Sequence, residues 1–224
     1  MSLSVLLPYL LYISLPILVV YLGYLILTKA FNDMGFSSFE AIVIVFASFL
    51  FGFGLLNFGG IEFNNIPLFD YGNWRVGINT GGAIIPIILS MYLVIKNKIS
   101  LKKLALGIVI VSIVTYFVTS PDPQKGIISR FPYWLLPVIF ASVSSLVLFW
   151  REKQKAAPFA YICGTIGVLV GADVFHLITL LSMQISKPTR AIIGGAVVFD
   201  MVFITGILAV IVDGMFIYKK KYQQ

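Results

Sequence analysis

Two aspartates and one histidine lie within stretches of the chain that otherwise consist almost entirely of apolar residues. Asp173 and His176 belong to the run GVLVGADVFH at 167–176, and Asp200 ends the run IIGGAVVFD at 192–200. Two carboxyl groups that share an apolar pocket cannot both ionise easily, so such a pair can hold and release a proton. Paired aspartates also activate water in aspartyl hydrolases. His176 follows Asp173 by three residues, so it lies on the same helical face and could relay protons.

Two glycine-rich motifs accompany these acids. The runs INTGGAIIP at 78–86 and IIGGAVVFD both contain the sequence GGA. Small residues allow helices to pack closely. In the first run, the glycines followed by Pro86 can break a helix, and broken helices near buried acids form the midplane sites of many transporters. The residues predicted to line such a site are Asn79, Thr80, Gly81, Gly82, Gly194 and Gly195.

Other roles for these acids remain open at the level of sequence. Each aspartate could be protonated or hydrogen-bonded and serve only to hold helices together. Asp173, Asp200 and His176 could also ligate a metal ion. We expect neither a bound metal nor another cofactor.

The composition is that of an integral membrane protein. Of 224 residues, 59% are hydrophobic and 11% are charged, whereas soluble domains carry roughly 25% charged residues. We therefore expect a multi-pass protein of the cell membrane, with the lipid bilayer as its partner. A formal net charge of +7 could indicate nucleic-acid binding in a soluble protein, but here basic residues flank apolar spans, and no nucleic-acid partner is expected. The single cysteine, Cys163, excludes an intramolecular disulfide.

Apolar runs of about 20 residues, the length that crosses the hydrocarbon layer, predict an all-α protein with about seven transmembrane helices in one domain over residues 1–224. The first run is too long for a signal peptide and has no basic residues before it, so we expect it to be retained. The predicted spans are 4–28, 38–58, 76–95, 103–119, 133–150, 158–183 and 188–217.

The last two spans position the two aspartates. They are joined by the short loop SKPTR, which makes them antiparallel neighbours. At about 1.5 Å per residue, Asp173 lies ~15 Å and Asp200 ~18 Å below the outer ends of their spans. The two carboxyl groups are therefore predicted to meet near the middle of the bilayer.

The loops predict the orientation of the chain. Basic residues are concentrated in the loops at 29–37, 96–102 and 151–157 and in the C-terminal segment. By the positive-inside rule this side is cytoplasmic, which places the N-terminus outside and the C-terminus inside. On the outer side, residues 59–75 mix strand-forming residues with turn signals and predict a short hairpin-like cap.

Further polar positions carry more modest expectations. The proline-rich outer loop at 120–132 is expected to be irregular. Asp213, near the inner end of the last span, is expected to be solvated. Ser142, Ser144 and Ser145 are predicted to form hydrogen bonds between helices.

The runs GINTGGAIIPIILSMYL, GVLVGADVFHL and AIIGGAVVFDMVFITGILAVI resemble the polytopic prokaryotic membrane proteins grouped as domain of unknown function 1614. The matching segments extend over roughly residues 76–212. The resemblance implies a compact helical membrane protein, and it supplies no activity because that family has no assigned reaction.

Presenilin-like intramembrane proteases also place two aspartates on consecutive membrane helices, which tests the hydrolase hypothesis. Their second aspartate follows a GxGD pattern, and a PAL motif lies on a later helix. Here Asp173 follows Gly-Ala, Asp200 follows Val-Phe, and no PAL sequence occurs. The arrangement of acids is similar, whereas the signature is missing.

Our leading functional hypothesis is a carrier that couples protons or cations to the movement of a small solute. Asp173 and Asp200 would carry the proton or cation, and His176 would relay protons towards the outer side. An intramembrane aspartyl hydrolase is the alternative, and it is the expectation if the protein is an enzyme. A non-catalytic membrane scaffold is a third hypothesis. The glycine-rich helix faces would permit a homo-oligomer.

Overall fold

The computed structural model describes residues 3–55, 57–58, 61–195 and 201–221. The long apolar runs of the chain fold as helices, and two of these runs include a π-helical segment, in which backbone hydrogen bonds span five residues. The α-helices are α1 (Leu3–Asp33), α2 (Ser38–Gly52), α3 (Ile85–Asn97), α4 (Leu101–Val118), α5 (Leu136–Leu148), α6 (Ala156–Val168), α7 (Phe175–Ser182) and α8 (Met201–Lys221). The π-helices are η1 (Thr80–Ile84) and η4 (Leu169–Val174), and the short 3₁₀ helices are η2 (Tyr133–Leu135) and η3 (Lys153–Lys155).

Four of the described helical stretches are long and apolar enough to cross a membrane. They are residues 14–33, 80–97, 101–118 and 153–182. Three shorter apolar helices cover 38–52, 133–148 and 201–216. Each predicted span overlaps one of these seven stretches, and together they indicate a membrane protein. The number of crossings and the orientation of the chain stay predictions.

The fold is mostly helical rather than all-α, because two predicted spans begin as strands. β4 (Trp74–Asn79) pairs with β3 (Asn65–Tyr71) in an antiparallel hairpin and with β7 (Thr189–Ile193) in parallel. The hairpin-like cap predicted at 59–75 is therefore present but extends to Asn79. An apolar run rich in Val and Ile fits a buried strand as well as a helix, so local pattern alone did not separate the two.

Two further hairpins lie among the described residues. β1 (Asn57–Phe58) pairs with β2 (Ile61–Glu62), and β5 (Thr119–Asp122) pairs with β6 (Gly126–Ser129). The expectation of irregular structure at 120–132 is thus wrong over the β5–β6 hairpin. Its turn forms because the Asp122 carboxylate accepts hydrogen bonds from the backbone N–H groups of Gln124 (2.8 Å) and Lys125 (2.9 Å).

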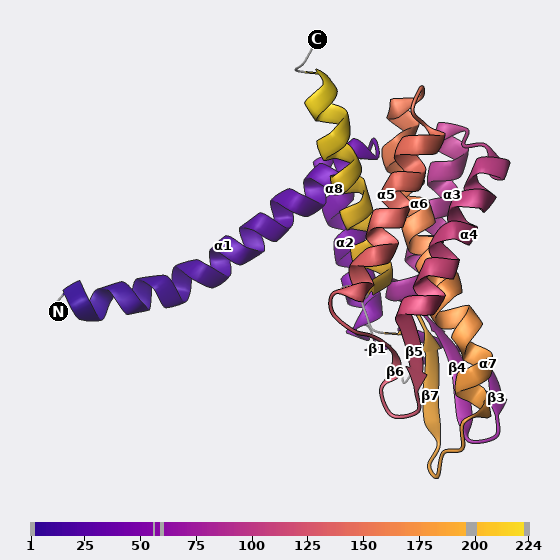
Figure 1. Cartoon of the computed structure of the whole chain (residues 1–224). Coiled ribbons are helices and arrows are strands. Elements are labelled where there is room, and N and C mark those ends of the chain that lie inside the picture. The colour runs from indigo at the N-terminus through magenta and orange to yellow at the C-terminus, as the bar shows by residue number, and fades with distance from the viewer. Residues whose placement is uncertain (1–2, 56, 59–60, 196–200, 222–224) are drawn as a thin grey trace.

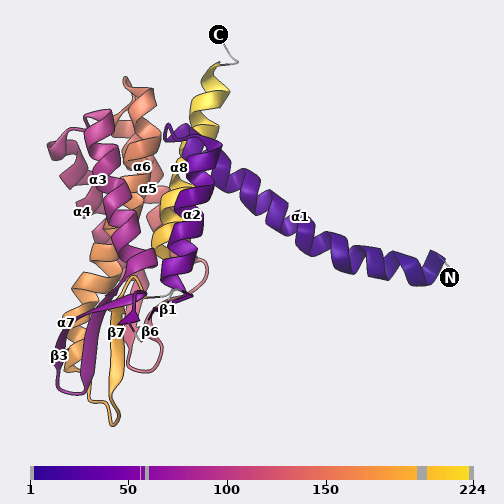
Figure 2. The same cartoon turned by 180° about the vertical axis from the view of Figure 1, so that it is seen from behind.

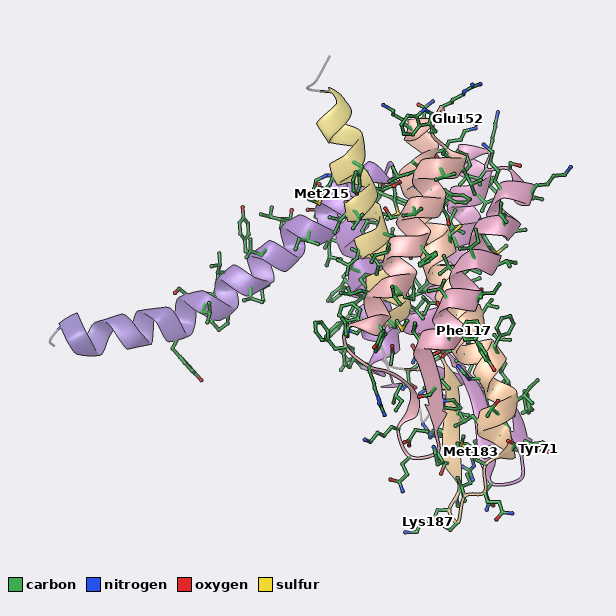
Figure 3. The ribbon with its side chains drawn as sticks, viewed as in Figure 1. Tyr71, Phe117, Glu152, Met183, Lys187 and Met215 are labelled. Atoms are coloured by element: carbon green, nitrogen blue, oxygen red, sulfur yellow. The ribbon has the colours of Figure 1, made fainter. Side chains whose placement is uncertain are left out.

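Helices α2 to α8 form an elongated bundle, and the strands gather at one end of it (Figure 1). We call this end, which carries β3, β4, β7 and the β5–β6 hairpin, the strand end, and we call the opposite end the helix end. Figure 3 shows Tyr71, Met183 and Lys187 at the strand end and Glu152 at the helix end. Helix α1 leaves the bundle and extends away from it, as both views show (Figure 1, Figure 2).

Helix α6 is the centre of the bundle. Of its 13 residues, all but Ile166 are buried, and it packs against α3, α4, α5 and α8. Small residues permit this packing: a Cβ on Gly164 would lie 3.2 Å from the backbone of Gly206 on α8. A Cβ on Gly167 would lie 2.6 Å from Val111 on α4. The glycines of α6 therefore allow α8 and α4 to pack closely against it.

Candidate functional site

A cavity of about 520 Å³ lies at the strand end, between the strands and the helical bundle. It falls within the roughly 300–1,000 Å³ typical of small-molecule sites. The β5–β6 hairpin, β4, β7, η4 and α8 all contribute to its wall. Its charged, amide and aromatic lining residues are Asp173, Gln124, Lys125, Arg190, Trp74 and Trp134.

Asp173 lies in the wall of this cavity, within the π-helix η4. Its Oδ2 accepts a hydrogen bond of 2.7 Å from the backbone N–H of Gly194. An ionised carboxylate can accept about four hydrogen bonds, so acceptor capacity remains for a bound ligand. π-Helical segments are frequent at functional sites, and this one carries the acid that the sequence singled out.

The parallel pairing of β4 and β7 brings the two GGA motifs together. Ile78 is paired with Ile193, so η1 and the Gly194–Gly195 turn start side by side. A Cβ on Gly82 would lie 2.1 Å from the carbonyl oxygen of Gly194, and Gly194 has a φ of +67°. Both positions thus require glycine, and their contact fixes the N–H group that binds Asp173.

Asn79 and Thr80 hold the strand end together instead of lining the cavity. The Asn79 Oδ1 accepts from the Gly82 N–H at 2.7 Å, and its Nδ2 donates to Asn65 Oδ1 at 3.0 Å. The Thr80 hydroxyl donates to the carbonyl oxygen of Phe63 at 2.6 Å. Pro86 does not break a helix; it lies in the first turn of α3, directly after η1, where proline is tolerated.

Gly81 is a packing position against α2. A Cβ there would lie 2.1 Å from the carbonyl oxygen of Ser48. Of the residues predicted to form the site, Asp173 and Gly195 line the cavity, and Gly194 supports it through its N–H group.

His176 is buried and faces α4. Its ring stacks on Tyr116 with 4.5 Å between ring centroids, and Nε2 lies 3.2 Å from the Tyr116 carbonyl oxygen and 3.1 Å from Thr119 Oγ1. A carbonyl oxygen can only accept, and the Thr119 hydroxyl already donates to the Thr115 carbonyl oxygen. Nε2 therefore carries the proton and donates to α4. This geometry anchors α7 to α4.

The predicted Asp173–Asp200 pair stays a prediction, because Asp200 lies in 196–200, outside the described residues. Within the described part of the chain, no cluster of three or more His, Cys, Asp or Glu side chains could hold a metal ion.

The sequence did not single out the basic and aromatic residues of the cavity. These residues are Lys125, Arg190, Trp74 and Trp134. They meet because β4 pairs with β7 across more than a hundred residues and the β5–β6 hairpin folds beside them. Such long-range pairing leaves no local sequence pattern.

The Asp122 turn makes the β5–β6 hairpin sensitive to acid. The backbone N–H groups of Gln124 and Lys125 lower the pKa of the Asp122 carboxyl. Its contribution to stability is therefore present at neutral pH and is lost in acid, as the pH falls through this lowered pKa. We expect the fluorescence of Trp134, which lines the cavity, to change over that range in the wild type. The corresponding step should be missing from Asp122→Ala, and an identical profile in both proteins would contradict this assignment.

Comparison with known proteins identifies a family but no activity. Residues 60–212 match the family described as "Protein of unknown function (DUF1614)". No curated protein matches the chain. No solved structure matches it either.

Proposed function

Because this chain belongs to the DUF1614 family of proteins of unknown function, we propose its role from the site itself: a membrane carrier that takes up a small charged solute at its strand end. The cavity whose wall contains Asp173 is the observation that carries this proposal. Asp173 would bind the cationic part of the solute or a coupling proton. Asp200 keeps its predicted role as the second proton-carrying group.

The charges of the cavity favour a solute that bears both signs. Asp173 offers a carboxyl group, and Lys125 and Arg190 offer cationic groups in the same wall. The indole rings of Trp74 and Trp134 supply apolar surface and aromatic faces that attract cations. A small zwitterion such as an amino acid matches this set of groups in charge and size.

The position of Asp173 along the continuous helix formed by α6, η4 and α7 supports access from the strand end. Charged residues at 151–155 precede Ala156, where the buried apolar helix begins. Asp173 follows Ala156 by 17 residues (173 minus 156), which is about 25 Å along the helix axis. In a hydrocarbon layer about 30 Å thick, Asp173 would then lie towards the strand side, closer to water than the middle of the bilayer.

Flux measurements in proteoliposomes test the proposal. We expect the full chain to move radiolabelled amino acids from a defined mixture in a pH-dependent manner. Asp173→Asn should lower this flux at least about tenfold, because it removes a charge-assisted hydrogen bond worth about 1.5–3 kcal/mol. The asparagine keeps an oxygen for the Gly194 N–H group, so the fold should be retained.

Asp70→Asn is the matched control, because Asp70 is exposed on β3 and does not line the cavity. It should transport as the wild type does. Equal flux in Asp173→Asn and in the wild type would overturn the proposal. Cleavage of a membrane-embedded peptide that is lost in Asp173→Asn would favour the intramembrane hydrolase instead.

A further inference from the structure

A second buried carboxyl group lies far from the cavity, towards the helix end. Asp213 of α8 is 0% exposed, so the expectation that it is solvated is wrong. Its Oδ2 lies 2.7 Å from the Ser145 hydroxyl of α5, and its Oδ1 lies 3.5 Å from the Ser142 hydroxyl. The predicted interhelical hydrogen bonds of Ser142 and Ser145 are thus confirmed, with Asp213 as their partner.

Three oxygen atoms in a row determine where the hydrogens must lie. The Ser145 Oγ is 2.8 Å from the carbonyl oxygen of Ala156 and 2.7 Å from Asp213 Oδ2. Both separations are hydrogen-bond distances, so each needs a hydrogen between its two oxygens. A serine hydroxyl has one hydrogen and a carbonyl has none. Two linear hydrogen bonds therefore need a second hydrogen, and the carboxyl group of Asp213 is the group that can carry it.

We propose that Asp213 is a proton-binding site, in which a protonated carboxyl group donates to Ser145 and Ser145 donates to the Ala156 carbonyl oxygen. The carboxyl proton links α8 to α5, and the hydroxyl hydrogen of Ser145 links α5 to α6. It does not rest on the proposed carrier function, because it uses none of the residues that line the cavity.

The charged groups around Asp213 are already paired with one another. On α1, the Lys29 Nζ donates to Asp33 Oδ2 at 3.1 Å, and this pair lies beside Gly214. Before α6, Lys155 pairs with Glu152 at 2.6 Å. Among the described residues, the structure gives Asp213 no ion pair of its own.

Loss of this proton would change how three helices pack. An ionised carboxylate would repel the Ser145 oxygen while that hydroxyl donates to Ala156, and a buried charge without a cation is strongly unfavourable. The contact of α8 with α5 and α6 at the helix end therefore depends on the proton. Release of the proton should admit water to this end of the bundle.

Infrared difference spectroscopy of the full chain in lipid bilayers tests the proposal. The spectrum of the wild type minus that of Asp213→Asn at pH 7 should contain the C=O band of a protonated carboxyl group, with a shift in deuterated buffer. Asparagine can replace the carboxyl proton with its own N–H donor to Ser145, so this variant should fold. Bands of an ionised carboxylate in the difference spectrum would overturn the proposal. This holds whether or not these bands change when NaCl is added.

Two further variants keep the experiment decisive. Asp122→Asn is the control, because the pKa of the Asp122 carboxyl is lowered. The spectrum of the wild type minus that of Asp122→Asn should therefore contain the bands of an ionised carboxylate. Ser145→Ala removes the acceptor of the proposed proton and leaves Asp213 in place. It should displace the carboxylic-acid band without affecting the carboxylate region, and it answers the question even if Asp213→Asn fails to fold. A change confined to the carboxylate region in Ser145→Ala would overturn the proposal.

Discussion

Gly82→Ala is expected to destabilise the protein by about 3 kcal/mol or more, which is the upper range for overpacking a buried position. The new Cβ would lie 2.1 Å from the carbonyl oxygen of Gly194, and that neighbour is backbone rather than the end of a flexible side chain. Gly194 could move only by shifting β7 against β4. The same shift would displace the N–H group that binds Asp173, so the variant should lose stability and disturb the cavity together.

The thermal midpoint in detergent should fall by roughly 10 °C, given about 2–4 °C per kcal/mol for a chain of this size. The buried Cys163 provides the measurement, because a thiol-reactive fluorogenic dye reacts only when the bundle opens. Gly23→Ala is the control: a Cβ at Gly23 of α1 meets nothing within 4 Å, and alanine favours a helix over glycine. Coincident melting of Gly82→Ala and the wild type would show that the β4–β7 contact does not constrain Gly82.

The helices of this fold follow from the sequence, and its strand end does not. The run at 103–119 was predicted as a span and folds as α4 at Leu101–Val118, because length and apolarity determine such a helix. The run that begins at 76 has the same apolar character but starts in β4. Only a partner strand, β7, distinguishes the two outcomes, and that partner lies at Thr189–Ile193.

The candidate sites divide in the same way. Because an acid inside a membrane is energetically costly, the sequence predicts a functional role for Asp173. The structure places this residue in the cavity wall. Asp213 lies near the end of an apolar run, where sequence reasoning expects solvent. The available signal was Ser142 and Ser145, which stand three residues apart on one face of α5 and supply the partners that make burial tolerable.

His176→Ala is expected to destabilise the protein by about 3 kcal/mol, because it removes a buried ring and a hydrogen-bond donor at once. His176 is only 6% exposed, its ring lies at 15° to that of Tyr116, and Nε2 is the donor to the Tyr116 carbonyl oxygen. These contacts attach α7 to α4 beside β5. Loss of the ring should therefore lower the melting temperature followed through Cys163 and loosen the strand end.

His176→Gln separates anchoring from the proton relay that the sequence predicts. Glutamine can place an N–H donor near the position of Nε2, so it should recover part of the lost stability, but its side chain does not titrate near neutral pH. If His176 serves as an anchor, pH-dependent flux in proteoliposomes should survive in His176→Gln while His176→Ala melts early. If instead His176→Gln is as stable as the wild type but its flux no longer depends on pH, the ring is a relay. In that case Nε2 must exchange its proton despite the Tyr116 and Thr119 acceptors, and the α4–α7 contact has to open during transport.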